Sequence, residues 1–211
     1  GTQGAIGMNT QTDILSAQAK MHQAQTSLVS LEDQMASIKS NLLLMTGWDY
    51  DSDVTIGAIP PADVSLLDTI DFEADKAIAP KNNYTIIGMR NAAPKDADGD
   101  GKYQNKDYTA RERGVEQATQ QLSITMDGLY LTMLEKKASL QAAQTAYEAA
   151  TLKWEGAGRK YQLGMLGNAE YLGEEIAYCA AKAAYESADL DMTQAMLNYY
   201  WGVNGLGELA E

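Results

Sequence analysis

The chain has 211 residues, 45% of them hydrophobic, and its 29 acidic and 16 basic residues give it a formal charge of −13. This acidic excess would repel a phosphate backbone, so we expect no nucleic-acid binding. A membrane-spanning helix needs a run of about eighteen apolar residues, and the sequence contains none, so we expect no membrane-spanning segment. The opening Gly1-Thr2 lacks a methionine and is typical of an expression remnant ahead of a mature or truncated chain.

Residues 12–45 are predicted to form one long helix with a coiled-coil edge. Apolar residues recur there at alternating spacings of three and four, and no proline interrupts them. The positions of this first seam are Ile14, Ala17, Met21, Ala24, Leu28, Leu31, Met35, Ile38, Leu42 and Met45. At about 1.5 Å per residue the helix would be roughly 50 Å long, so its narrow apolar edge needs a partner helix of similar length.

The first helix is predicted to end at Gly47, and residues 48–93 are predicted to form a connector. An extended linker rich in Asp, Gly and Pro comes first. Two short helices then follow at residues 71–79 and 83–93, separated by Pro80. Their predicted buried positions are Ala74, Ile78, Ile86, Ile87 and Met89.

Two further long heptad helices are predicted at residues 109–161 and 169–201. The first begins at Thr109-Ala-Arg-Glu112, which has the form of a capping box. Only a few residues join the two helices, so they must fold back on each other as an antiparallel hairpin. The second seam consists of Val115, Ala118, Leu122, Met126, Leu129, Met133, Leu140, Ala143, Tyr147, Ala150, Trp154, Ala157 and Tyr161, with Lys136 in one seam position.

The last helix carries two rows of seven-residue period. The tyrosine row is Tyr171, Tyr178, Tyr185, Met192 and Tyr199, and the flanking row is Leu172, Ile176, Cys179, Ala183, Leu190 and Leu197. We interpret the tyrosine row as a packing stripe in preference to a ligand site, and in a barrel it could face a neighbouring subunit. Cys179 is interpreted as a buried, inert thiol.

Together these patterns predict an all-α fold. Residues 1–211 would form a single domain, an elongated antiparallel coiled-coil bundle of long heptad helices with short connector helices and an extended linker. The seams offer more apolar stripe than one such bundle can cover, so we also expect homo-oligomers.

The chain also contains an internal repeat with an offset of 157 residues. This offset pairs Gly7, Asp13, Leu15, Ala24 and Met35 with Gly164, Glu170, Leu172, Ala181 and Met192. A turn with glycine, an acid six residues later and a long heptad helix therefore occur twice. The alternative is that any two Ala-rich heptad helices align somewhere, but this does not explain the glycine and acid ahead of both helices.

The repeat motifs resemble those of the TolC-like outer-membrane efflux proteins. The second copy contains Tyr161-Gln-Leu-Gly164, Glu170-Tyr171-Leu172 and the closing Trp201-Gly-Val-Asn-Gly205. The first copy contains Gly7, Thr12-Asp13-Ile14-Leu15 and the closing Leu44-Met-Thr-Gly47. The resemblance covers most of the chain.

This resemblance implies a helical barrel, usually a trimer of two-repeat subunits, in the cell envelope. Its hairpin tips would dock a periplasmic or membrane-fusion adaptor protein, and the implied tip residues are Gly7, Thr12, Asp13, Tyr161, Gly164 and Glu170. The chain departs from the family pattern because Leu166 occupies the place of the tip arginine and no β-strands can be placed between the repeats. It therefore resembles either a fragment or a reduced member.

Residues 94–108, which replace the barrel strands, contain a candidate calcium loop. Asp96, Asp98, Asp100 and Asp107 stand at loop positions 1, 3, 5 and 12, and Gly101 stands at position 6. This matches the oxygen ligands of an EF-hand-type loop, in which Lys102 would contribute its carbonyl. The alternative is a solvated Asp/Gly turn.

Three classes of function remain open. The first is a TolC-like component of an efflux or export system, on the periplasmic or extracellular side. The others are a non-transporting structural coiled coil and a calcium-dependent interaction module of the cell envelope. No phosphate loop, nucleophile motif or carboxylate pair suggests catalysis, so we do not expect an enzyme.

Overall fold

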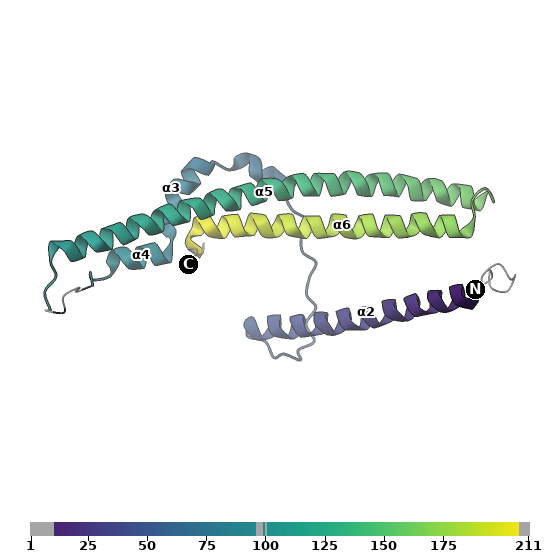
Figure 1. Ribbon diagram of the computed structural model, residues 1–211, viewed down its shortest axis with the longest axis horizontal. Coiled ribbons are helices and arrows are strands. Elements are labelled where there is room, and N and C mark those ends of the chain that lie inside the picture. Colours follow the sequence, from purple (N-terminus) through teal and green to yellow (C-terminus); the bar gives the residue numbers. More distant parts are fainter. Residues whose placement is uncertain (1–10, 96–98, 100, 207–211) are drawn as a thin grey trace. The chain divides into compact units, whose positions relative to one another are not determined.

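The computed structural model describes residues 11–95, 99 and 101–206, except for the side chains of residues 11–14, 16 and 17. Every regular element in this part of the chain is a helix, which confirms the predicted all-α class. None of these helices combines the length and the apolar character that crossing a bilayer requires. The chain divides into two units, Gly1–Ala58 and Ile59–Glu211, and Figure 1 shows the course of the helices within each.

The first unit consists of one long helix, α2 (Gln11–Met45), close to the predicted residues 12–45. The helix ends in a Schellman motif, in which Gly47 N–H donates to Leu44 O at 3.2 Å and Trp48 N–H donates to Leu43 O at 2.8 Å. Gly47 has φ +83, which favours glycine.

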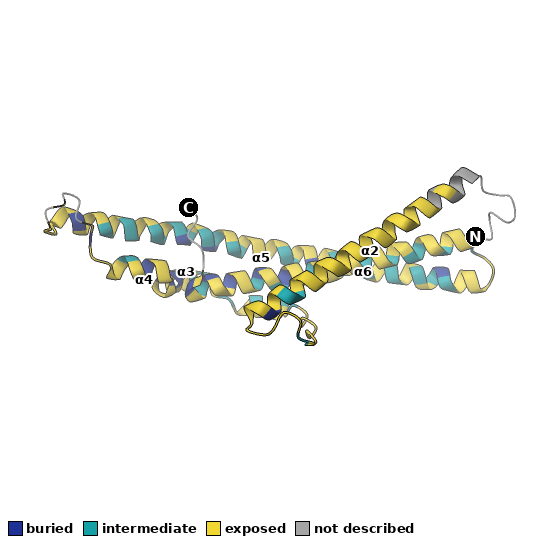
Figure 2. Cartoon of the chain, turned by 90° about the horizontal axis from the view of Figure 1, so that it is seen from below, coloured by how far each residue is buried: buried dark blue, intermediate teal, exposed yellow. Residues whose placement is uncertain are grey.

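The first seam is open to solvent along the described side chains of α2 (Figure 2). The exposed fractions of its large side chains range from 42% at Leu42 to 86% at Met45. Leu43, outside the seam, is the buried residue of the helix at 4% exposed. Within the first unit, therefore, no described residue covers this heptad edge.

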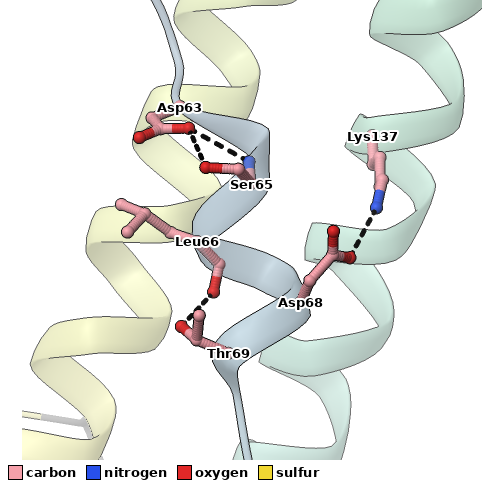
Figure 3. A network of polar contacts seen from close by, with 6 residues as sticks. All are labelled: Asp63, Ser65, Leu66, Asp68, Thr69 and Lys137. Atoms are coloured by element: carbon pink, nitrogen blue, oxygen red, sulfur yellow. Dashed lines mark hydrogen bonds and ion pairs between the residues drawn. The ribbon is translucent and has the colours of Figure 1, made fainter.

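The second unit begins with a short 3-10 helix, η1 (Val64–Thr69), which was not predicted. Asp63 caps it, because its Oδ1 accepts the Ser65 N–H at 3.1 Å and the Ser65 hydroxyl at 2.6 Å (Figure 3). Lys137 reaches Asp68 at 3.6 Å and so links η1 to the long helix beside it.

Two short helices follow, α3 (Phe72–Asn82) and α4 (Tyr84–Asn91), as predicted. Their boundary lies at Asn83, and α3 continues through Pro80. Asn83 Oδ1 accepts the Ile86 N–H at 3.1 Å and caps α4, so this asparagine ends one helix and starts the next. Of the predicted buried positions Ile86 is fully buried and Ile87 and Met89 are half-buried, whereas Ala74 and Ile78 are exposed and were wrong.

The rest of the unit is a hairpin of α5 (Asn105–Gln162) and α6 (Asn168–Trp201). The residue numbers of the aromatic partners increase along α5 as they decrease along α6, which shows that the two helices are antiparallel. The pairs are Tyr147 with Tyr185, Trp154 with Tyr178 and Tyr161 with Tyr171. With 58 residues, α5 is about 87 Å long. A bundle that also includes α2 stays a prediction.

The start of α5 differs from the prediction. The helix begins at Asn105, four residues before Thr109, and Thr109 donates its hydroxyl to Asn105 O inside the helix. Its capping box is formed by Gln104 and Asp107, because Asp107 Oδ2 accepts the Gln104 N–H at 2.8 Å. This pair has the same spacing as Thr109 and Glu112, and no breaker separates the two, so the earlier cap sets the boundary.

The second seam packs against neighbouring helices: from Met126 onward it lies along α6 and the turn that follows it, and before Met126 it lies beside the connector helices. Its positions up to Ala157 are buried or half-buried, with Leu122, Met126 and Met133 at 1% exposed or less. Lys136, the polar residue in the seam, donates to Asp191 Oδ2 at 2.7 Å, and this hydrogen bond raises the pKa of the lysine.

The tyrosine row packs inside the hairpin against aromatic residues of α5. Ring centroids lie 5.6 Å apart for Tyr147 and Tyr185 and 4.6 Å apart for Trp154 and Tyr178. The packing interpretation is therefore confirmed, since the row is covered within the hairpin and does not supply a face toward a neighbouring subunit. The flanking row is exposed, including Cys179, so the buried-thiol prediction was wrong.

A π-helical turn, η2 (Gly202–Leu206), follows α6 and packs against the connector helix α3. Gly205, at φ +100, lies so close to the end of α3 that an added Cβ would be 2.2 Å from Asn82 O. Asn82 Nδ2 donates to Val203 O at 3.0 Å across the same contact. The closing motif of the repeat is therefore a packing site that fixes α6 to the end of α3.

Candidate functional site

The turn between α5 and α6 is built around Gly164, the C′ residue of a Schellman motif. Gly164 N–H donates to Tyr161 O at 3.0 Å, and Met165 N–H donates to Lys160 O at 2.8 Å. Gly164 has φ +69, and nothing lies within 4 Å of the Cβ that a larger residue would add. The backbone conformation therefore requires glycine here, and the available space does not.

Tyr161 and Glu170 hold this turn together from its two sides. The Tyr161 ring stacks on Tyr171 with centroids 4.8 Å apart, and its hydroxyl reaches Asn168 Oδ1 at 3.4 Å. Glu170 Oε2 accepts the Gly167 N–H at 3.3 Å, which caps the first turn of α6. Both side chains remain exposed, so their structural contacts leave this end of the hairpin open to a partner.

The most exposed apolar side chains of the tip were not among the predicted site residues. Leu163 is 75% exposed and Met165 is 73% exposed, on either side of Gly164. Leu166, at the position where the resemblance to the TolC-like pattern led us to expect an arginine, is half-buried. The sequence carried a signal for them, since apolar residues next to a turn glycine have no neighbouring helix face to cover them.

The residues of the other predicted tip are only partly described. Gly7 lies outside the described residues. Thr12 and Asp13 lie in the first turn of α2, and their side chains are outside the description. Whether these residues and the Gly164 turn act together stays a prediction.

The candidate calcium loop is also only partly described, because Asp96, Asp98 and Asp100 lie outside the described residues. Gly101 has φ +76, as the sharp mid-loop turn of a calcium loop needs. Asp107 belongs to the first turn of α5, is 4% exposed, and already uses one oxygen to cap that helix. No group of three or more potential metal ligands occurs among the described residues, and the calcium site stays a prediction.

Comparison of the chain with protein-family models, with curated proteins and with solved structures gave no match. The TolC-like interpretation therefore depends on the motifs of this sequence and on the geometry of the two repeats.

Proposed function

We propose that this protein is a TolC-like component of a cell-envelope efflux or export system, in which its hairpin tips dock a membrane-fusion adaptor protein. The proposed setting is the periplasmic or extracellular side of the envelope. The role is mechanical and not enzymatic: long helices form the wall of a conduit, and the turns at their ends meet the partner.

The observation that carries this proposal is the equivalence of α2 and α6. The two helices have 35 and 34 residues, and their first residues, Gln11 and Asn168, are separated by the same 157 positions as the repeated motifs. Each helix is followed within a few residues by a glycine of positive φ, Gly47 and Gly205. Two helices of 35 and 34 residues, each followed by a glycine of positive φ, support a two-repeat protein of this kind.

The repeat also supports an assembly of several copies. The first seam, shifted by 157 residues, falls on the face of α6 that packs against α5. In α6 this face includes Met192, Ala195 and Tyr199, which are 6% exposed or less. Their equivalents in α2 are Met35, Ile38 and Leu42, which are exposed. We propose that a homo-oligomer, in which the long helices form an elongated antiparallel bundle, covers this face.

The tip is the proposed docking surface, because Leu163 and Met165 are apolar, exposed and held by a rigid turn. A Gly164→Trp variant tests this role, with Gly47→Trp, at another glycine of positive φ, as the matched control. Neither glycine has a neighbouring atom within 4 Å of an added Cβ. We expect the Gly164 variant to lose adaptor binding and export while the Gly47 variant keeps both. Equal activity of the two variants in an export assay would argue against docking at the tip.

The alternative is a structural coiled coil or calcium-dependent interaction module of the envelope, without transport. The exposed first seam is compatible with this function too, since any long helical partner could cover it. The predicted calcium loop, with ligands from Asp96, Asp98, Asp100, Asp107 and the Lys102 carbonyl, would then control the partner. Loss of partner binding on chelation of calcium, with no dependence on Gly164, would favour this alternative.

A further inference from the structure

A groove of about 560 Å³ lies in the second unit, where the end of α6 meets η1 and α3. Its walls are mainly apolar and include Leu66, Ile70, Met133, Met196, Leu197 and Val203. Both the volume and the apolar lining are typical of sites for small organic molecules.

One carboxylate, that of Asp75, is the only charged group among the residues that line this groove. Its Oδ2 accepts the Tyr199 hydroxyl at 2.8 Å. The neighbouring Lys76 is directed elsewhere, because its Nζ pairs with Asp127 at 2.6 Å. Lys137, one turn of α5 after the lining residue Met133, pairs with Asp68. Among the described residues, therefore, no ion pair neutralises Asp75.

Tyr199 leaves Asp75 as the single negative charge of the groove. Its side chain is 4% exposed, and burial, followed by the hydrogen bond to Asp75, raises the pKa of its hydroxyl. The hydroxyl is therefore a proton donor to the carboxylate at neutral pH and adds no second negative charge. The groove thus combines an apolar wall, two tyrosine rings at positions 199 and 200, and one negative charge.

We propose that this groove binds an amphipathic organic cation, with its apolar body against the aliphatic wall and its positive charge beside Asp75. A cation gains from the carboxylate in this partly desolvated site and from the faces of the tyrosine rings. An anion of the same shape would meet an unneutralised carboxylate. The proposal is independent of the export function, because it depends only on side chains within the second unit.

Two ions of the same shape and opposite charge, tetraphenylphosphonium and tetraphenylborate, test the proposal by calorimetric titration of the full chain. We expect tetraphenylphosphonium to bind at least tenfold more tightly than tetraphenylborate. In methionine-methyl NMR spectra its addition should shift the Met133 and Met196 signals and leave Met21 and Met35 of α2 unchanged. Equal affinity for the two ions, or shifts confined to the α2 methionines, overturns the proposal.

Variants separate the groove from the general acidity of the chain. Asp75→Asn should weaken tetraphenylphosphonium binding tenfold or more, whereas Glu116→Gln, which removes one exposed charge elsewhere on α5, should change it less than twofold. Tyr199→Phe keeps the carboxylate and removes its hydroxyl donor, so this variant should bind the cation at least as tightly. If Asp75→Asn does not fold, Met196→Trp should fill the groove and abolish binding. Unchanged affinity in Asp75→Asn or in Met196→Trp overturns the proposal.

Discussion

The contact between Gly205 and the end of α3 predicts that two glycines of positive φ differ greatly in their tolerance of a side chain. Gly205 and Gly164 have φ +100 and +69. An added Cβ would have no neighbour within 4 Å at Gly164, but at Gly205 it would lie 2.2 Å from Asn82 O and 2.8 Å from Asn82 C. The obstacle at Gly205 is backbone, which cannot move aside as a flexible side chain can.

Three contributions set the size of the effect. An alanine at positive φ costs about 1 kcal/mol at either site. At Gly205 a backbone shift costs about 1 to 3 kcal/mol more, by analogy with overpacked cores. The same shift would break the hydrogen bond from Asn82 Nδ2 to Val203 O, which contributes about 1 kcal/mol to stability. We therefore expect Gly205→Ala to lower the free energy of unfolding by about 3 to 5 kcal/mol and Gly164→Ala by about 1 kcal/mol.

Urea unfolding followed by circular dichroism measures both values, and thermal unfolding gives a second reading. For a unit of this size, 1 kcal/mol corresponds to about 2 to 4 °C in Tm, so Gly205→Ala should melt about 6 to 20 °C lower. Gly47→Ala, at φ +83 with no atom near the added Cβ, is a second control and should behave like Gly164→Ala. If all three variants lose the same stability, the closing motif does not pack against α3 as described.

Three further predictions concern metal binding, association and pH. Calcium should bind the loop at residues 96–107 with a Kd of about 10⁻⁴ to 10⁻³ M and add only about 1.4 kcal/mol of stability at tenfold excess over Kd. Calorimetric titration measures this binding, with Asp96→Ala and Asp100→Ala as controls, and the absence of heat would show that the loop is a solvated turn. In sedimentation, Leu28→Asp in the first seam should shift the protein toward monomer, whereas Val29→Asp, at a similar exposure outside the seam, should not; identical profiles would contradict the seam as an interface. Folding raises the pKa of Tyr199, so the protonated hydroxyl stabilises the folded state fully below the ordinary pKa near 10, and this contribution is lost as the pH rises above that value. The free energy of unfolding of Tyr199→Phe should therefore fall less above about pH 10 than that of the unmodified protein, and equal losses in the two proteins would refute this.

The helices were predictable because apolar spacing records the face that each helix buries. The first seam predicted the start of α2 to within one residue, and the second seam matched the covered face of α5 from Val115 to Ala157. The Gly164 turn was predictable because a few residues between two heptad patterns allow only a tight reversal. The packing of the tyrosine row followed from its seven-residue period.

Other features depend on contacts between residues distant in sequence. Nothing local to Gly205 indicates that Asn82 O lies against it, and nothing local to Asp75 indicates the groove beside Tyr199. Start signals also compete: Gln104 with Asp107 and Thr109 with Glu112 are both capping pairs, and only the folded helix shows which one acts. Cys179 and Ile78 were misassigned because an apolar row indicates a face without indicating whether another element covers it.

Site-specific photo-crosslinking in the producing cell is the most direct test of the proposed docking of an adaptor protein at the α5–α6 tip. A photoreactive residue is placed at Met165 on the tip or at Ile124 in α5, which are 73% and 62% exposed. We predict that the tip position crosslinks to a membrane-fusion adaptor, identified by mass spectrometry, and that position 124 does not. Crosslinks to an adaptor from position 124 alone, or none from the tip while export proceeds, would contradict the claim.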